Sequence, residues 1–300
     1  MSAGPVIVEE LHHRVVDSRI RMFRAGEEVD TFVVSTSRFV VFIDTMSTPV
    51  LMRQVIEKVR PDLDGRLVLV INTHADWDHV YGNSLFAPDG EQPALIIGRA
   101  LTRERLRSSA ALEQLKRQQA EENRFAEVTL APPDLVFADA LTLSGGDLTL
   151  ELVATPGHTP DHCSVWIPEI GTLLAGDAAE FPFPSVQGGA TLAQVRSSLQ
   201  YLTTFKPRVV LPCHGGTTGP DLLDQNLAYF SRLRDLVKAE APLEHWSALT
   251  ELALPPPLRY AAVLEGLGTT PERVPAFYRG FHLDAVKATA EETENEDHTS

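Results

Sequence analysis

Cysteine is scarce in this chain: only Cys163 and Cys213 occur in 300 residues. Two cysteines cannot build a disulfide framework, and they form no cysteine-based metal motif, so we expect a reducing, cytoplasmic location. The N-terminus shows neither a basic leader nor an apolar run of signal-peptide length. No stretch is long and apolar enough to cross a bilayer, so we expect no membrane association.

Positive charge is also in short supply. Lys and Arg number 26 against 41 Asp and Glu, which gives a formal net charge of −15. Nucleic-acid-binding domains usually carry a basic patch or stripe, so this balance argues against a nucleic-acid partner. Part of the negative charge lies in residues 291–297, and we expect residues 288–300 to form a disordered acidic tail. The apolar content of 43% is ordinary for a globular protein.

The most informative segment present is Thr73–His79, which reads THADWDH. It follows the apolar run Leu67–Ile71, which is typical of a buried strand. Within six residues it holds four side chains that can bind metals: His74, Asp76, Asp78 and His79. Charged groups at the end of a buried strand are costly unless their charge is compensated, and a bound metal ion compensates it.

The same arrangement recurs three times further along the chain. His158 follows the apolar run 148–153, Asp177 follows 172–174, and His214 follows 209–211. Each apolar run ends in a turn that carries a residue of metal-ligand type. Loops that leave strands at one edge of a sheet commonly assemble a site in this way.

In order and surroundings, these motifs resemble the signature of the metallo-β-lactamase superfamily. That signature is H-x-H-x-D-H, then a His in a Gly-His-Thr context, an Asp in a Gly-Asp context and a final His. The resemblance covers Thr73 to Gly216 and is specific because all four motifs occur in order. It implies an α/β fold, a four-layer αβ/βα sandwich that begins near residue 7, with a catalytic domain over residues 1–219.

Asp76 departs from the signature, which has its second His at this position. One interpretation is a degenerate site that binds one metal or none. The other is an exchange of ligands, similar to the flavodiiron proteins, in which a Glu at this position of the same fold binds iron. The presence of all other ligand residues favours the exchange.

The resemblance implies two divalent metal ions per chain. The ligands would form two sets of three and one bridge: His74, Asp76 and His158 for the first metal; Asp78, His79 and His214 for the second; and Asp177 for both. Asp78 is also the expected catalytic residue. The extra carboxylate at Asp76 favours iron or manganese in the first site more than a histidine would, while zinc also accepts carboxylate ligands.

Four further residues are weaker candidates for substrate contacts: Trp77, His162, Phe181 and Phe183. His162 could point at the mouth of the site or support a ligand. The three aromatic residues could line an apolar pocket, although core packing is the more common role for each alone.

Two regions could modify the site. Residues 100–124 form a charged helical stretch with a partial apolar seam, which could act as a lid, pack on the core or form the contact of a homodimer. Residues 220–287 read as a helical extension packed on the core, interrupted by prolines and glycines.

The leading hypothesis for function is a dinuclear metal-dependent hydrolase of a small-molecule ester, thioester or lactone, with a metal-bridging hydroxide as the nucleophile. This follows from the resemblance, whose glyoxalase II-like and lactonase-like members suggest such substrates. One alternative is a di-iron redox enzyme related to the flavodiiron proteins, but the helical residues after 220 leave no room for a flavodoxin domain. Others are a nuclease of the RNase Z or RNase J kind, which the acidic balance disfavours, and a non-catalytic metal-binding protein with a degraded site.

Overall fold

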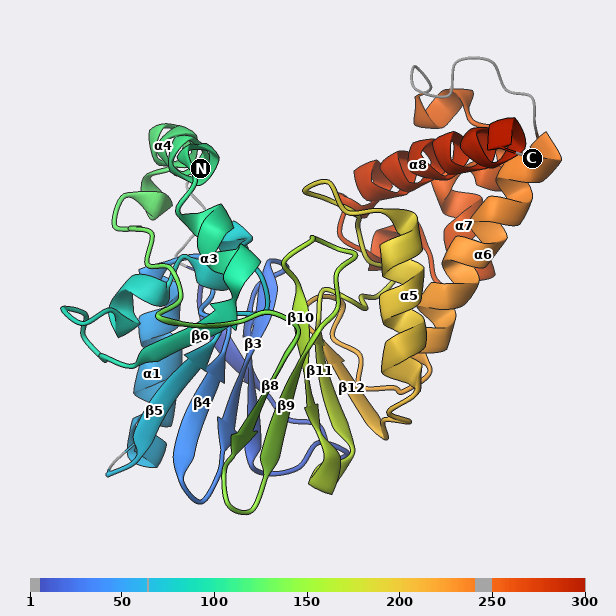
Figure 1. The fold of residues 1–300 in the computed structure, drawn as a ribbon. Helices are drawn as coiled ribbons and strands as arrows, with labels where there is room; N and C mark the ends of the chain where they lie inside the picture. Colours follow the sequence, from blue (N-terminus) through green and yellow to red (C-terminus); the bar gives the residue numbers. More distant parts are fainter. Residues whose placement is uncertain (1–5, 64, 241–249, 300) are drawn as a thin grey trace.

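The computed structural model describes residues 6–63, 65–240 and 250–299, of which 296–299 are described by their backbone only. Two β-sheets face each other at its centre (Figure 1). The seven-stranded sheet has the strands in sequence order: β1 (Val8–Leu11), β2 (Ile20–Ala25), β3 (Val29–Ser35), β4 (Phe39–Ile43), β5 (Leu67–Ile71), β6 (Leu95–Arg99) and β7 (Leu135–Phe137). The five-stranded sheet has the reverse order: β12 (Val209–Pro212), β11 (Thr172–Gly176), β10 (Cys163–Ile167), β9 (Thr149–Ala154) and β8 (Ala140–Ser144).

Helices cover the outer faces of both sheets. Helix α1 (Pro49–Leu63) lies outside the seven-stranded sheet, and α5 (Leu192–Thr203) and α6 (Leu222–Glu240) lie outside the five-stranded sheet (Figure 1). The order of layers is therefore helix, sheet, sheet, helix. The predicted four-layer αβ/βα sandwich is confirmed.

Strand direction determines where the connecting loops emerge. Strands β4 to β7 are mutually parallel, and so are β11 and β12. Strand β9 runs in the same direction as β11, because both are antiparallel to β10. All five residues of β4 and the last four of β5 are buried, as expected for strands covered on both faces. Parallel strands place their carboxyl ends at a common edge, where ligands usually bind in such sheets.

The charged helical stretch predicted over residues 100–124 consists mainly of two helices, α3 (Ala100–Leu106) and α4 (Ser109–Glu121). The break has a local cause. The side chain of Ser108 accepts a hydrogen bond from the backbone N–H of Ala111 at 3.2 Å and so starts a new helix as its N-cap. This divides the segment into a short helix beside the sheet and a longer one further out.

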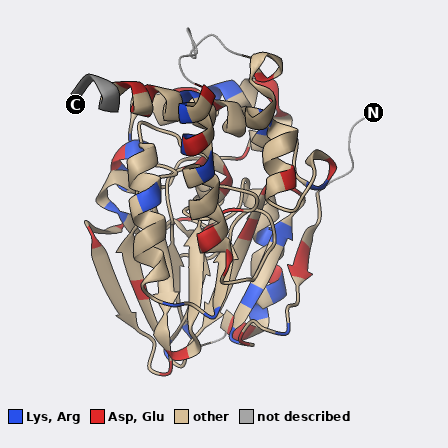
Figure 2. Ribbon diagram, turned by 90° about the vertical axis from the view of Figure 1, so that its right-hand side faces the viewer, with Lys and Arg blue, Asp and Glu red and all other residues tan. Residues whose placement is uncertain are grey.

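The C-terminal helices extend the outer layer of the five-stranded sheet. Helices α6, α7 (Tyr260–Gly266) and α8 (Tyr278–Thr299) share one apolar core with α5, to which Leu199, Phe230 and Val286 contribute. Charged residues of both signs are distributed along these helices (Figure 2). The described part of 220–287 is therefore a packed extension, while residues 241–249 of that predicted segment lie outside the described residues.

The prediction of a disordered tail over residues 288–300 is wrong for the part that the structure describes. Helix α8 continues to Thr299. Ala290 is fully buried, and Glu292 forms an ion pair with Arg196 of α5 at 2.6 Å. Composition indicated disorder because the segment is acidic, but α8 packs on α6 and α5, which buries Ala290, and Glu292 finds a partner in Arg196.

Candidate metal centre

All seven predicted ligands lie at the end of the sandwich where β5, β9, β11 and β12 finish. His74 and Asp76 lie in the loop after β5, and Asp78 and His79 lie on the short helix α2 (Trp77–Val80) that follows. The other three occupy the loops after β9, β11 and β12: His158, Asp177 and His214. Residues up to 140 positions apart in the chain thus meet at one edge.

The side chains converge on one carboxylate oxygen. Oδ2 of Asp177 lies 3.2 Å from Nε2 of His214, 3.3 Å from that of His79, 3.5 Å from that of His158 and 3.8 Å from that of His74. A single carboxylate therefore contacts four imidazole rings. This is the position required of a ligand that two metal ions share.

Two further carboxylates divide the histidines into pairs. Oδ2 of Asp76 lies 3.2 Å from Nε2 of His158 and 3.5 Å from Nε2 of His74. Oδ2 of Asp78 lies 3.5 Å from Nε2 of His214 and 3.6 Å from Nε2 of His79. Each set of three offers ligand atoms within 4.8 Å of one another. The two sets adjoin through Asp177.

The hydrogen bonds on the far side of the histidine rings direct Nε2 toward the carboxylates of the cluster. Nδ1 of His79 lies 2.9 Å from Oδ2 of Asp44, and Nδ1 of His74 lies 3.0 Å from Oγ1 of Thr73. Nδ1 of His158 lies 3.2 Å from the carbonyl oxygen of Ser185. A proton on Nδ1 satisfies each of these contacts and leaves the Nε2 lone pair available, as in histidines that bind metals.

Several buried atoms of this cluster have no hydrogen-bond partner among the described residues. They include Nε2 of His74, Nε2 of His79 and Oδ1 of Asp177. Orphaned polar atoms in a protein interior are costly, so their presence at one point calls for an explanation. Four imidazoles and three carboxylates with free lone pairs fit a divalent metal such as zinc, iron or manganese.

The charges of the cluster shift its pKa values in opposite directions. Burial lowers the pKa of His214, but Asp177, Glu180 and Asp78 together raise it to about 10. Burial also lowers the pKa of His158, but Asp76, Asp177 and Glu180 raise it to about 9. Burial raises the pKa of Asp177, yet the surrounding histidines bring it well below its ordinary value. The groups thus hold protons that a metal ion would displace, so metal binding here depends on pH.

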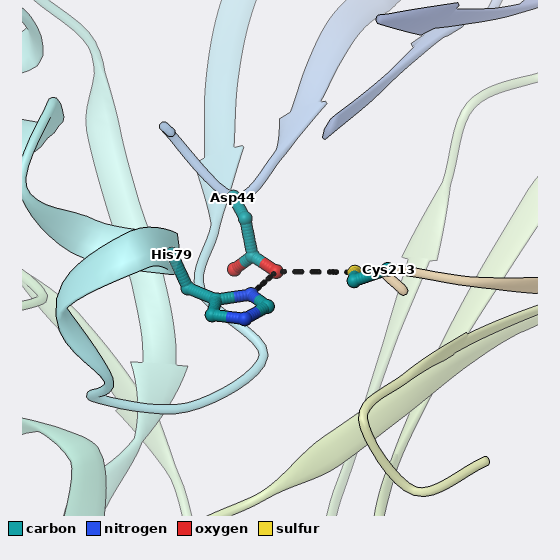
Figure 3. Close-up of side chains that lie close together, drawn as sticks. All are labelled: Asp44, His79 and Cys213. Carbon is teal, nitrogen blue, oxygen red and sulfur yellow. Dashed lines mark hydrogen bonds and ion pairs between the residues drawn. The ribbon is translucent and has the colours of Figure 1, made fainter. Parts of the chain in front are cut away.

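Asp44 supports both ligand sets from beneath. It is fully buried directly after β4 and contacts His79 on one side and the thiol of Cys213 at 3.8 Å on the other (Figure 3). Its two oxygens also accept hydrogen bonds from the backbone N–H of Thr73 at 2.8 Å and from Oγ1 of Thr73 at 2.7 Å. Asp44 therefore orients the segment that carries His74 as well as the ring of His79.

His162 lies behind the cluster and does not line the cavity. Its Nε2 accepts a hydrogen bond from the backbone N–H of Asp177 at 2.9 Å, and its Nδ1 lies 2.8 Å from Oγ1 of Thr155. Only glycine fits at Gly176, because a Cβ there would lie 2.5 Å from Nε2 of His162. His162 thus positions Asp177 and does not line the cavity as a substrate contact.

A cavity of about 600 Å³ opens above the cluster. Five of the predicted ligands line it, together with residues from four other regions of the chain: Glu27, Glu28, Trp77, Arg105, Gln114, Glu180, Ser185, Gln187, Gly188, Phe277 and Phe281. Trp77 lines the cavity, and its contact with a substrate stays a prediction. Phe183 is fully buried and stacks on Tyr229 with ring centroids 4.1 Å apart, and Phe181 packs against the same core. Both are packing residues.

Arg105 and Glu180 are cavity residues that the sequence did not suggest. Arg105 of α3 donates a hydrogen bond to Oδ1 of Asp76 at 2.7 Å and also pairs with the buried Asp161. Glu180 accepts a hydrogen bond from the hydroxyl of Tyr278 on α8 at 2.6 Å. Burial and the nearby Asp177 raise the pKa of Glu180 to about 7. Its place in the apolar run after Asp177 was the available signal, since an isolated Glu in such a run needs a partner.

Fold and site together define a protein built to bind metal ions between two β-sheets. A model of the metallo-β-lactamase superfamily matches residues 25–214 of the 300. The chain belongs to this superfamily, whose members are usually metal-dependent hydrolases.

Solved structures show the same fold. A metallo-β-lactamase family protein from Thermus thermophilus aligns with 98% of this chain and 93% of its own, with a TM-score of 0.63 and 17% identity. The metallo-β-lactamase FIM-1 from Pseudomonas aeruginosa, in a mono-zinc form, aligns with 74% of this chain and 94% of its own, with a TM-score of 0.56 and 18% identity. At these identities the likeness concerns the fold alone.

One relative is similar in sequence over a short stretch. A beta-lactamase-like protein 2 homolog from Caenorhabditis elegans is 33% identical over 82 residues, which are 26% of this chain and 25% of that protein. The match thus spans about a quarter of the relative's length. Within the described residues, no helix combines the length and apolar character needed to cross a membrane.

Proposed function

We propose that the protein is a dinuclear metal-dependent hydrolase of a small-molecule ester, thioester or lactone, acting in the cytoplasm. The observation that supports this most is the pair of three-residue ligand sets that share Asp177, whose Oδ2 lies within 3.8 Å of four histidine Nε2 atoms. Two divalent ions held there would polarise a carbonyl oxygen and supply a nucleophile from water at neutral pH.

The remaining roles belong to residues of the chain itself. Asp44, Thr73 and Ser185 contact Nδ1 of the histidine rings and so direct Nε2 toward the metal site. His162 fixes the backbone of Asp177. Asp78 lines the cavity beside His214 and is our candidate for the catalytic carboxylate.

The chain offers no thiol for a covalent route through this cavity. Cys163 and Cys213 are both buried, and neither lines the cavity. Cys213 faces Asp44 beneath the cluster (Figure 3). Hydrolysis by an activated water is the chemistry that needs no protein nucleophile.

The position of Asp76 bears on the choice between an exchanged ligand and a degraded site. Its two oxygens have different partners: Oδ1 contacts Arg105, while Oδ2 contacts His158 and His74. One oxygen is therefore available to a metal while the other is anchored. Arg105 also balances the extra negative charge that Asp76 brings, which supports an intact site with an exchanged ligand.

The test combines metal content with hydrolysis. Elemental analysis of the purified protein is expected to give close to two metal ions per chain. Assays with a generic ester, a thioester and a lactone show which of the three bonds the protein hydrolyses. Asp78→Asn should lower kcat/KM by about 100-fold or more, whereas the matched variant Asp89→Asn, in an exposed turn, should not. The proposal would be wrong if the purified protein contained no metal, or if Asp78→Asn had the same kcat/KM as the wild type. Bound iron with oxygen consumption would instead support the redox alternative.

A further inference from the structure

The C-terminal helix α8 contributes an aromatic wall to the cavity above the metal centre. Phe277, directly before α8, and Phe281 on its first turn both line the cavity. Their ring centroids lie 5.5 Å apart, and Phe277 remains 44% exposed. Adjacent apolar side chains that line a cavity offer a contact surface for an apolar group.

A third aromatic residue lines the same cavity from the other part of the molecule. Trp77, on α2 between the ligands Asp76 and Asp78, is held edge-to-face against Phe125, with centroids 5.6 Å apart. Figure 1 shows α3 and α4 on one side of this end of the sandwich and α8 on the other. The cavity thus has apolar surfaces contributed by both halves of the chain, with the ligand cluster below.

The charged groups around the cavity are mostly acidic. Besides the aspartates of the metal centre, Glu27, Glu28 and Glu180 line it. Among the described residues that line it, Arg105 is the sole Lys or Arg, and its guanidinium is engaged by Asp76 and Asp161. In the metal-loaded protein the metal ions offset the aspartates of the metal centre. Elsewhere in the cavity an anionic group would meet Glu27, and Glu28 paired with Arg124, with no unengaged Lys or Arg among the described lining residues.

From these two features we propose a substrate class that rests on the hydrolase function proposed above. The substrate carries a hydrocarbon group that packs against Phe277 and Phe281, and it carries no negative charge. The family match ends at residue 214, so this specificity comes from a part of the chain that the family model does not describe. Helix α8 is then a specificity element.

Chain length is the variable that tests the hydrocarbon contact. Hydrolysis of p-nitrophenyl acetate, butyrate, hexanoate and octanoate by the metal-loaded full chain is expected to give a kcat/KM that rises roughly two- to fourfold per methylene group. Phe277→Ala and Phe281→Ala should flatten this rise. Tyr201→Ala is the matched control, because Tyr201 is also 44% exposed but lies on α5 away from the cavity.

Binding without hydrolysis separates this inference from the proposed function. Calorimetric titration with neutral amides should show octanamide binding more tightly than acetamide, with the difference lost in Phe277→Ala. Ester hydrolysis with no chain-length dependence, or with a dependence unchanged in both Phe variants, would overturn the inference and leave the hydrolase intact. If octanamide bound more tightly than acetamide but no ester were hydrolysed, the hydrocarbon contact with Phe277 and Phe281 would be supported and the hydrolase function would be wrong. If the protein neither hydrolysed an ester nor bound the amides in this graded order, the hydrolase function and the hydrocarbon contact would both be wrong.

A matched pair of esters tests the charge. The p-nitrophenyl ester of hexanoic acid should be hydrolysed at least about fivefold faster, in kcat/KM, than the mono-ester of hexanedioic acid, in which a carboxylate replaces the terminal methyl group. Glu27→Lys should narrow this ratio. Glu57→Lys, on α1 outside the seven-stranded sheet, should not. If the anionic ester were hydrolysed as fast as the neutral ester or faster, the inference that the substrate carries no negative charge would be wrong.

Discussion

Replacement of Asp44 by Asn should weaken metal binding while the protein remains folded. Oδ1 of Asp44 accepts a hydrogen bond from the backbone N–H of Thr73, and Oδ2 accepts from Oγ1 of Thr73 and from Nδ1 of His79 (Figure 3). Because Oγ1 of Thr73 donates to Asp44, it is free to accept from Nδ1 of His74. One carboxylate thus fixes the tautomers of two ligand histidines, one in each set.

An Asn side chain has two orientations here, and neither reproduces the carboxylate. With its NH₂ group in the place of Oδ2, it donates to both Oγ1 of Thr73 and Nδ1 of His79. Thr73 must then donate to His74, so both rings carry their proton on Nε2 and cannot bind metal. With its oxygen there, the tautomers are retained, but the NH₂ group faces the N–H of Thr73.

The magnitude follows from that second orientation, which metal binding requires. Two opposed buried donors cost about 1–3 kcal/mol. Because about 1.4 kcal/mol corresponds to tenfold in an equilibrium constant, the affinity for metal should fall roughly 5- to 150-fold. This agrees with the loss of about 10- to 100-fold that is common when a residue supporting a metal ligand is changed.

Competition with a chromophoric zinc chelator measures the affinity, and thermal unfolding of the metal-free protein shows whether the fold is retained. Asp134→Asn is a suitable control, because Asp134 is exposed and accepts a backbone hydrogen bond from Ile96 far from the centre. Wild-type affinity in Asp44→Asn would show that Asp44 does not set the tautomers, and the reasoning would have to be abandoned.

Three further predictions concern other parts of the molecule. Asp76→Ala should empty the first ligand set alone, and Asp76→His should restore occupancy and shift preference toward zinc; elemental analysis decides, and full metal retention in Asp76→Ala contradicts the assignment. Asp177→Ala should impair both sets together, so loss of one metal with the other bound normally argues against a bridge. Burial lowers the pKa of His282, which accepts a hydrogen bond from Tyr229 and donates one to Leu258. Its contribution to stability is therefore present above the unfolded pKa of about 6.5 and is lost as pH falls toward the lower folded value, by up to about 1.4 kcal/mol per pH unit. His282→Gln should reduce the fall in Tm from about pH 7.5 to about pH 5.5 relative to wild type, and an unchanged fall would refute this.

The sequence by itself determined the parts of this protein that depend on short-range pattern. The run Leu67–Ile71 predicted a buried strand, and THADWDH directly after it predicted a loop of ligands, because strand and loop are specified by adjacent residues. The ligands after β9, β11 and β12 followed from the same pattern. The four-layer sandwich followed from the resemblance that those motifs carry.

Only the tertiary structure decided which side chains meet across the chain. Glu180 reaches Tyr278 across 98 positions of sequence, and Arg105 reaches Asp76 across 29. No periodicity encodes these contacts, because they depend on how α8 and α3 pack at the end of the sandwich. The segment 288–299 shows the same limit. Its acidic composition predicted a disordered tail, but the packing of α8 on α6 and α5 buries Ala290 and stabilises the helix. Local pattern set the ligand loops, whereas the packing of distant helices set the cavity above them.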